Sequence, residues 1–224
     1  MRLRITFAKT EEMRYTGHLD LHRTWERTFR RAGLPLAYSQ GFHPQPRLNL
    51  ASALPLGFTS QCEMADVWLE QFVQVQEARA ALEKSAPPGI QIQAVEEVEE
   101  KAPALQTQVI ASEYVITLMD PKPHLEQRIQ ELLAEQSLPR DRRGKRYDLR
   151  PLVEELRQLP DDDQQRTRLF LRLSSRPAAT GRPEELLSAL DILPTSALVH
   201  RIKLIFDRSV EPHGPVTPPA PTAG

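Results

Sequence analysis

The chain has little of several features that would define a protein class on their own. Among its 224 residues there is one cysteine, Cys62, so an internal disulfide, a zinc ribbon and an iron–sulfur cluster of its own are excluded. No stretch reaches the 18 or more apolar residues that span a bilayer, and residues 1–20 lack the apolar core of a signal peptide. The sequence therefore predicts a cytoplasmic globular protein that makes no contact with membranes.

Neither the net charge nor a known enzyme motif identifies a partner or a reaction for this chain. The 29 lysines and arginines balance 30 aspartates and glutamates, so total charge indicates no particular partner. There is no phosphate-binding glycine loop and no G-x-S-x-G motif, so we expect no cofactor. Aromatic residues make up 6% of the chain, and no strand carries the aromatic signature of an RNA-recognition sheet. Any functional signal must come from local arrangement.

The first hundred residues alternate between strand and helix patterns. Residues 2–7 alternate polar and apolar side chains with period two, which is typical of a strand. Residues 18–32 place apolar side chains at helical spacing, and Gly33 follows where a helix C-cap is expected. The remaining predicted elements are strands over 47–50, 62–70 and 90–94 and a helix over 75–85. The order is β-α-β-β-α-β.

The second half repeats this order after a break. Residues 101–108 have no periodicity, which indicates a linker over 101–110. Strands are then predicted over 114–118, 169–173 and 198–205, helices over 123–136 and 180–190, and the strand of a hairpin, or else a helix, within 148–159. We expect an α+β fold of two tandem ferredoxin-like (split β-α-β) domains with antiparallel sheets, at 1–100 and 111–208. The proline-rich residues 209–224 are predicted to be a disordered tail.

Charge is segregated along the chain. Residues 1–50 hold nine basic and four acidic residues, whereas residues 51–103 hold three basic and nine acidic ones. Four arginines share one face of the predicted helix over 18–32, where guanidinium groups could follow phosphates, and a second basic run covers 140–150. The competing interpretation is that the basic first half meets the acidic run 96–100 within the domain.

Residues 39–46 combine a glycine, an aromatic, a histidine and two prolines, a composition typical of a shaped binding loop. The alternative is that Phe42 fills the core and the prolines stiffen an irregular crossing. On the RNA hypothesis the residues predicted to contact RNA are Arg23, Arg27, Arg30, Arg31, Phe42, His43, Arg47, Arg142, Arg143, Lys145, Arg146 and Arg182.

Three histidines could carry chemistry. His18 and His22 are four residues apart on the predicted helix and could bind a metal together, although no glutamate completes an H-E-x-x-H motif. His18 and His43 could instead act as an acid–base pair on an RNA 2′-hydroxyl. The structural alternative is that His18 caps the helix start or hydrogen-bonds in the Gly41–Pro46 loop, and that His22 is a residue at the surface or at the boundary of the core.

Several runs of residues together resemble a known family. They are Gly17-His18-Leu19-Asp20-Leu21 with Arg23, Arg30-Arg31-Ala32-Gly33-Leu34-Pro35, Ser39-Gln40-Gly41-Phe42-His43-Pro44, Ala53-Leu54-Pro55-Leu56-Gly57 with Asp66, Gly144-Lys145-Arg146-Tyr147-Asp148-Leu149-Arg150-Pro151 and Thr180-Gly181-Arg182-Pro183-Glu184-Glu185. The sequence is similar to the radical-SAM-linked domain of unknown function over nearly its whole length. The resemblance implies a radical-SAM protein as partner, because members of that family are fused to such proteins or encoded beside them. Some members are associated with ribonuclease E/G-type proteins.

Three functional hypotheses follow. The first is a non-catalytic accessory module that binds structured RNA, tRNA or rRNA, and presents it to a radical-SAM enzyme. The second is a small RNA-processing enzyme that uses His18 and His43. The third is a protein-interaction adaptor whose basic helix docks on an acidic partner and binds no RNA.

Overall fold

A computed structural model of the chain describes residues 1–142 and 144–207. Arg143 and the predicted tail, 209–224, lie outside the described residues. The strands are β1 (Arg2–Lys9), β2 (Leu48–Leu50), β3 (Phe58–Trp68), β4 (Ile90–Val98), β5 (Val109–Leu118), β6 (Pro139–Arg142), β7 (Lys145–Asp148), β8 (Val153–Leu159), β9 (Arg168–Arg176), β10 (Ala179–Thr180) and β11 (Ala197–Phe206). The helices are α1 (His18–Arg31), α2 (Val75–Ser85), α3 (Leu105–Gln108), α4 (Leu125–Ala134) and α5 (Pro183–Ala189), with 3₁₀ turns η1 (Glu11–Met13), η2 (Arg150–Leu152) and η3 (Pro194–Ser196). None of the helices in this part of the chain is long and apolar enough to cross a bilayer.

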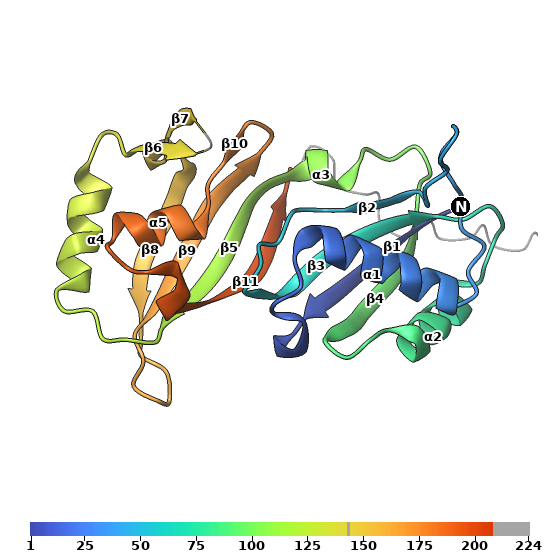
Figure 1. Cartoon of the computed structure of the whole chain (residues 1–224), viewed down its shortest axis with the longest axis horizontal. Coiled ribbons are helices and arrows are strands. Elements are labelled where there is room, and N and C mark those ends of the chain that lie inside the picture. Colours follow the sequence, from blue (N-terminus) through green and yellow to red (C-terminus); the bar gives the residue numbers. More distant parts are fainter. Residues whose placement is uncertain (143, 208–224) are drawn as a thin grey trace, which may run out of the picture.

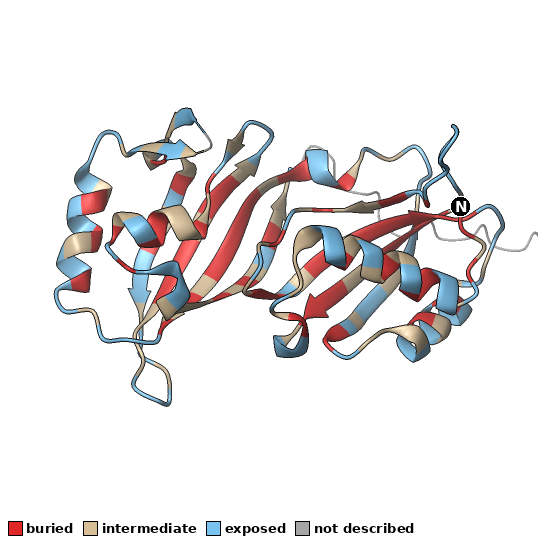
Figure 2. Ribbon diagram, in the orientation of Figure 1, coloured by how far each residue is buried: buried red, intermediate tan, exposed pale blue. Residues whose placement is uncertain are grey.

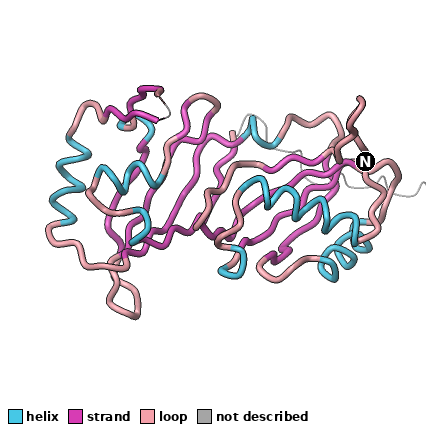
Figure 3. The backbone as a smooth tube through the Cα atoms, viewed as in Figure 1, coloured by secondary structure: helices cyan, strands magenta, loops and turns pink. Residues whose placement is uncertain are grey.

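Nine of the described strands form one continuous sheet. Its order is β10-β9-β5-β11-β3-β1-β4, with β8 also paired to β9 and β2 to β3. Every pair is antiparallel except β11 with β3, where Val199 lies opposite Phe58 and Arg201 opposite Ser60. Helices α1, α2, α4 and α5 cover one face of this sheet (Figures 1 and 3). Strands β6 and β7 form a separate hairpin at one end of the molecule.

The predicted α+β class is confirmed, but the arrangement differs from the expectation of a separate sheet in each half. In the first half the strands run β2-β3-β1-β4, and in the second half they run β8-β9-β5-β11. The two sets merge because β11 pairs with the beginning of β3 while β2 pairs with its end, Leu48 opposite Val67. Periodicity reports which residues face the core and carries no information on which strand edges meet, so the sequence did not show this junction.

The core of the first half follows from the alternation in β1. Leu3, Ile5 and Phe7 are fully buried and face α1, whose Trp25 and Phe29 are also buried. The Trp25 ring meets the edge of the Phe7 ring at 4.7 Å between centroids, in a T-shaped arrangement. Figure 2 shows the buried residues concentrated between the sheet and the helices.

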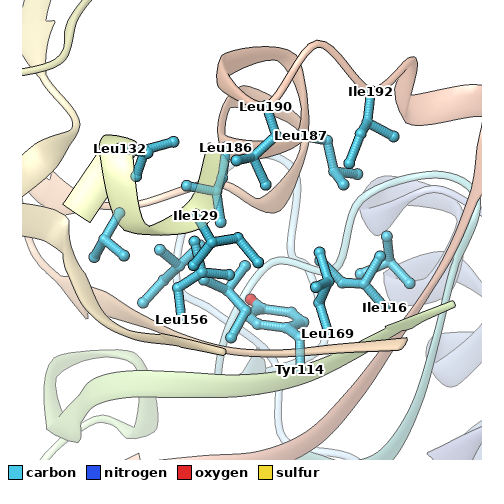
Figure 4. Packing of buried hydrophobic residues seen from close by; sticks show 14 of the residues in the cluster. Tyr114, Ile116, Ile129, Leu132, Leu156, Leu169, Leu186, Leu187, Leu190 and Ile192 are labelled. Carbon is cyan, nitrogen blue, oxygen red and sulfur yellow. The ribbon is translucent and has the colours of Figure 1, made fainter. Parts of the chain in front are cut away.

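A second core lies under α4 and α5. Ile116 of β5 and Leu169 of β9 are opposite each other in register and fully buried, and Ile129 of α4 and Leu186 of α5 pack over them (Figure 4). The ambiguous segment 148–159 supplies β8, which forms an antiparallel hairpin with β9 and so settles the prediction in favour of a strand.

The segment expected to be a linker contains α3. Leu105 is fully buried and packs with Val109, Leu204 and Ala51 in a small third cluster. The stretch 101–110 therefore packs against neighbouring strands in the described structure.

Candidate nucleic-acid interface

Helix α1 presents its arginines away from the core. Arg23, Arg27, Arg30 and Arg31 are all exposed, on the side opposite the buried Trp25. Arg30 and Arg31 lie in the last turn, where cations stabilise the negative end of the helix dipole. Arg23 Nη1 lies 3.5 Å from Asp20 Oδ1, and in the part of the chain that the structure describes the other three arginines have no ion pair.

The acidic run 96–100 does not neutralise this face. No ion pair joins a residue of α1 to that run within residues 1–142 and 144–207. The acids of α1 itself are engaged locally, Asp20 with Arg23 and Glu26 with His22. The arginine face of α1 therefore keeps a positive charge that the described protein leaves available to a partner.

A hollow of about 570 Å³ lies beside this face. It is lined by residues from the ends of α1 and α2, including Arg31 and Lys84. Two cationic side chains at one shallow depression suit a phosphate group more than an apolar ligand.

Residues 36–47, the first hairpin, form a protruding ribbon between α1 and β2. Tyr38 pairs with Pro46 across the ribbon, and the Ser39 amide donates to the Gln45 carbonyl at 2.8 Å. Phe42 at the tip is 102% exposed relative to a reference residue, so the core-filling alternative is wrong. His43 beside it is exposed as well.

Arg47 anchors the base of the first hairpin. Its amide donates to the Ala37 carbonyl at 2.8 Å, and its carbonyl accepts from the Trp68 amide at 3.1 Å. Its guanidinium carbon lies 4.9 Å from the centroid of the Trp68 ring, and Arg2 lies 4.7 Å from the same ring. This contact holds one exposed cation at a fixed place.

The second basic run contains the hairpin of β6 and β7, described over residues 139–142 and 144–148 and named here the second hairpin. Lys145 and Arg146 are exposed and Arg142 is half-buried. Asp148 closes the base, because its Oδ1 accepts from the amides of Leu138 at 2.8 Å and Arg150 at 2.9 Å. These two bonds hold the pKa of the Asp148 carboxyl below its usual range. The four described cations of this hairpin, Arg140, Arg142, Lys145 and Arg146, have no ion pair within the described ranges.

The second hairpin packs against the start of α5. Burial raises the pKa of Tyr147 in β7 and also that of Glu184 in the first turn of α5. Arg142 acts on both groups electrostatically, which places it beside them. Arg182, at the N-cap of α5, is half-buried next to this group. Arg142, through its charge, and Arg182, through its place in the chain, are therefore both near Glu184.

The structure keeps His18 and His22 one turn apart on α1 and does not bring His43 to them. His18 begins α1, whereas His43 lies on the first hairpin, which follows the other end of that helix. His22 Nδ1 lies 3.1 Å from Glu26 Oε1 and its Nε2 lies 3.4 Å from the Leu48 carbonyl oxygen, so both ring nitrogens have partners. Within the described residues there is no group of three or more His, Cys, Asp and Glu side chains arranged to hold a metal.

The sequence reasoning missed a buried polar cluster at the junction of the two halves. Arg201 of β11 donates from Nη1 to Glu63 of β3 at 2.9 Å and from Nη2 to the Ala53 carbonyl at 2.7 Å. Lys9 of β1, also fully buried, donates to the Phe58 carbonyl at 2.9 Å, and burial lowers its pKa from 10.5 to about 8. The detectable signal was a charged residue at an inward-facing position of an otherwise alternating strand, as at Arg201.

His18 lies at the margin of this cluster. Burial, followed by the nearby His22, lowers its pKa. Its Nδ1 is buried and has no hydrogen-bond partner among the residues that the structure describes. The cluster fills the space between the two hydrophobic cores, and its members are too enclosed to receive a macromolecule.

Several solved structures contain chains that are distantly similar to this one. A chain of "Crystal Structure of a Cbf5-Nop10-Gar1 Complex" is 10% identical, with 90% of this chain and 48% of that chain covered and a TM-score of 0.47. A chain of "Structure of H/ACA RNP bound to a substrate RNA containing 2'-deoxyuridine" is 10% identical, with 82% of this chain and 43% of that chain covered and a TM-score of 0.41. A chain of "Crystal structure of the archaeal box H/ACA sRNP Nop10-Cbf5 complex" is 11% identical, with 80% of this chain and 42% of that chain covered and a TM-score of 0.37. This chain spans less than half the length of those chains. At such identities and TM-scores they assign no function to it.

No curated protein matches the sequence. A family model does match, over residues 2–183, and it is described as "Uncharacterized protein conserved in bacteria (DUF2344)". Because this match covers well over half of the 224 residues, the protein belongs to the DUF2344 family of uncharacterized proteins conserved in bacteria.

Proposed function

We propose that the protein is a non-catalytic accessory module that binds structured RNA, tRNA or rRNA, and presents it to a radical-SAM enzyme. The observation that carries the RNA part is the exposed row Arg27, Arg30 and Arg31 on α1, which has no ion-pair partner in the described structure. An arginine that is free of a protein partner binds a phosphate without first breaking an ion pair. Helical spacing keeps the three guanidinium groups on one side, as contact with a phosphate backbone requires.

The second hairpin adds to this proposal. Lys145 and Arg146 are exposed near the open turn at Gly144, so they can approach a backbone without obstruction. Arg182 and Arg142 lie on the same half. The proposed RNA-contacting set consists of these four residues, the α1 arginines Arg23, Arg27, Arg30 and Arg31, the first-hairpin residues Phe42, His43 and Arg47, and Arg143, which is named on sequence grounds alone.

The radical-SAM partner rests on the family resemblance of the sequence. The chain has a single cysteine, so the three cysteines that hold a radical-SAM cluster must belong to the partner. A partner of this kind and an RNA substrate place the proposed function in the cytoplasm. The placement of His18 and His43 gives no support to the RNA-processing alternative.

The strand orders also support a finer description of the fold. Both β2-β3-β1-β4 and β8-β9-β5-β11 correspond to a split β-α-β arrangement with two helices on one face. We propose that residues 1–100 and 111–208 are two ferredoxin-like units in tandem, with 101–110 between them, that share one sheet.

Charge reversal of the α1 face tests the RNA proposal. Titration of bulk tRNA with the Arg27→Glu/Arg30→Glu variant should show about tenfold or greater weakening at 0.1 M salt. The slope of log affinity against log salt should fall by roughly 1 to 2, because each lost phosphate contact removes about 0.7–0.9.

A matched control separates this from an effect of net charge. Arg157→Glu/Arg176→Glu makes the same change in total charge at arginines already paired with Glu155 and Glu154. That variant should bind tRNA nearly as the unmodified protein does. Equal losses of affinity in both variants, or equal affinities of all three proteins, would contradict an RNA interface on α1. If the unmodified protein binds no RNA at any salt concentration, the protein-adaptor hypothesis is the one that remains.

A further inference from the structure

The two hairpins occupy the same place in the two halves of the chain. The first hairpin, residues 36–47, lies between α1 and β2, and the second, residues 139–148, lies between α4 and β8. In each half the hairpin therefore follows the first long helix and precedes a strand, β2 or β8, that pairs with the next strand of the main sheet, β3 or β9.

The two halves of the chain also have the same strand direction within the sheet. Strand β1 is antiparallel to β3, β3 is parallel to β11, and β11 is antiparallel to β5. It follows that β1 and β5 run in the same direction, so the second half repeats the first by displacement along the sheet and not by a two-fold rotation. Equivalent loops then emerge on the same side of the sheet, and in Figure 1 both hairpins lie on the upper side of the molecule, near its two ends.

Each hairpin has a braced base and an open tip. At the first hairpin, Arg47 is tied to Ala37 and Trp68 through backbone bonds of 2.8 and 3.1 Å. At the second, Asp148 holds the chain on both sides, and the Leu149 amide donates to the Leu138 carbonyl at 2.9 Å. A fixed base limits the conformational entropy that each tip loses when it contacts a ligand.

The tips differ in chemistry. The second hairpin presents Lys145 and Arg146, exposed and without ion-pair partners in the described chain, and so suits phosphates. The first presents the whole ring of Phe42, with His43 beside it. In a stable duplex the base faces are stacked on one another, so a ring of this kind finds a partner only at an unpaired base.

We infer that the two hairpins grip one RNA together, the second on the phosphates of a helical stem and the first by stacking Phe42 on an unpaired base beside it. This inference rests on the proposed RNA binding and narrows the substrate to an RNA with a junction between paired and unpaired segments. The cationic second hairpin favours a polyanion over a protein as the common ligand.

Two RNAs test the inference, a stem with a single-stranded overhang and the same stem with a blunt end. Phe42→Ala should weaken binding of the overhang RNA about tenfold, in line with the loss of one base–aromatic stack, and leave the blunt RNA unaffected. Lys145→Glu/Arg146→Glu should weaken both RNAs and reduce both salt slopes. Phe72→Ala, at a phenylalanine that is 66% exposed and outside both hairpins, is the control and should change neither.

Joint binding predicts a further dependence on stem length. When the overhang is kept and the stem is shortened until it cannot reach both hairpins, affinity should fall to the level of the Lys145→Glu/Arg146→Glu variant. Phe42→Trp should retain binding and show fluorescence quenching with the overhang RNA only.

The outcomes separate this inference from the proposed function. Equal binding of both RNAs by Phe42→Ala and the unmodified protein, with the α1 charge reversal still harmful, overturns the hairpin grip and leaves RNA binding in place. A Phe42→Ala defect confined to a protein partner overturns it too. Absence of RNA binding by the unmodified protein overturns both.

Discussion

Arg201 Nη1 in β11 donates hydrogen bonds to both carboxylate oxygens of Glu63 in β3, at 2.9 and 3.2 Å, with the two side chains 2% and 3% exposed. The pair bridges the one parallel junction of the sheet, between residues 138 positions apart. Tyr114 of β5 lies beside it, with its hydroxyl 3.3 Å from Arg201 Nη2. The ion pair therefore links a strand of the first half to a strand of the second half.

Breaking this pair on one side should be strongly destabilising. In Arg201→Met the carboxylate of Glu63 is left buried without its ion-pair partner, so we expect the free energy of unfolding to drop by about 3–5 kcal/mol. Urea unfolding measures the change. Arg79→Met, which breaks the exposed Arg79–Glu83 pair, should cost less than about 1 kcal/mol.

A double variant distinguishes loss of the pair from loss of packing. Arg201→Met/Glu63→Leu removes both charges and should recover much of the stability lost by Arg201→Met. If the double variant is less stable than Arg201→Met, the arginine acts through its shape and its bond to the Ala53 carbonyl, and the ion-pair account is wrong.

The buried Lys9 gives a second prediction, on pH. Its pKa is about 8 in the fold against 10.5 for an ordinary lysine, so between these pH values the unfolded chain binds more protons and rising pH stabilises the fold. Cys62 opposes this above pH 9, because burial raises its pKa from 9.0 to about 11 and the folded chain then holds the extra proton. The free energy of unfolding should rise by roughly 1 kcal/mol from pH 8 to 9 and then level off.

Replacing Cys62 separates its contribution to the pH dependence of stability from that of Lys9. In Cys62→Ala the rise should continue towards pH 10.5, as measured by urea unfolding at a series of pH values. A flat profile from pH 8 to 9 in both proteins would show that Lys9 keeps an ordinary pKa inside the fold.

Gly89 provides a third prediction, on backbone geometry. It has φ +91°, and a Cβ at this position would lie 2.5 Å from Met13 Cγ and 2.9 Å from the Met13 backbone nitrogen. Gly33 also has positive φ, +68°, but a Cβ there would have no atom of the described residues within 4 Å. Gly33→Ala should therefore cost about 1 kcal/mol, and Gly89→Ala about 2 kcal/mol or more, in urea unfolding. Equal costs would show that η1 moves aside freely.

The sequence predicted best where hydrophobic periodicity was strong. The alternation in β1 and the helical spacing around Trp25 gave both elements almost to the residue. The second hairpin was missed as a pair of strands because its residues are nearly all charged and show no apolar alternation. The sequence showed that this segment is basic. It did not show the hairpin, whose base depends on the hydrogen bonds that Asp148 accepts.

The candidate interface was likewise predicted in part from the sequence. That the α1 arginines face outward followed from the helical pattern, since they lie opposite Trp25. That Arg27, Arg30 and Arg31 have no acidic partner among the described residues could not follow, because it depends on where the run 96–100 is placed by the pairing of β4 with β1. Lys9 and Arg201 escaped prediction for a related reason, since the groups that make their burial tolerable come from β3 and its neighbouring loops.

The last prediction concerns Asp20, the acid that partly neutralises the α1 face. Its Oδ1 lies 3.5 Å from Arg23 Nη1, and both side chains are 68% exposed. Asp20→Asn frees Arg23 for a phosphate and removes a negative charge from the surface that RNA approaches, so bulk tRNA should bind several-fold more tightly, with a steeper salt slope. Glu154→Gln makes the same change in charge beside Arg176 in the second half and should have a much smaller effect, since only screened long-range attraction remains there. If the two variants gain equally, the protein attracts RNA through its overall charge and α1 has no special part. If Asp20→Asn binds less well, the carboxylate positions Arg23 productively and the ion pair belongs to the binding surface.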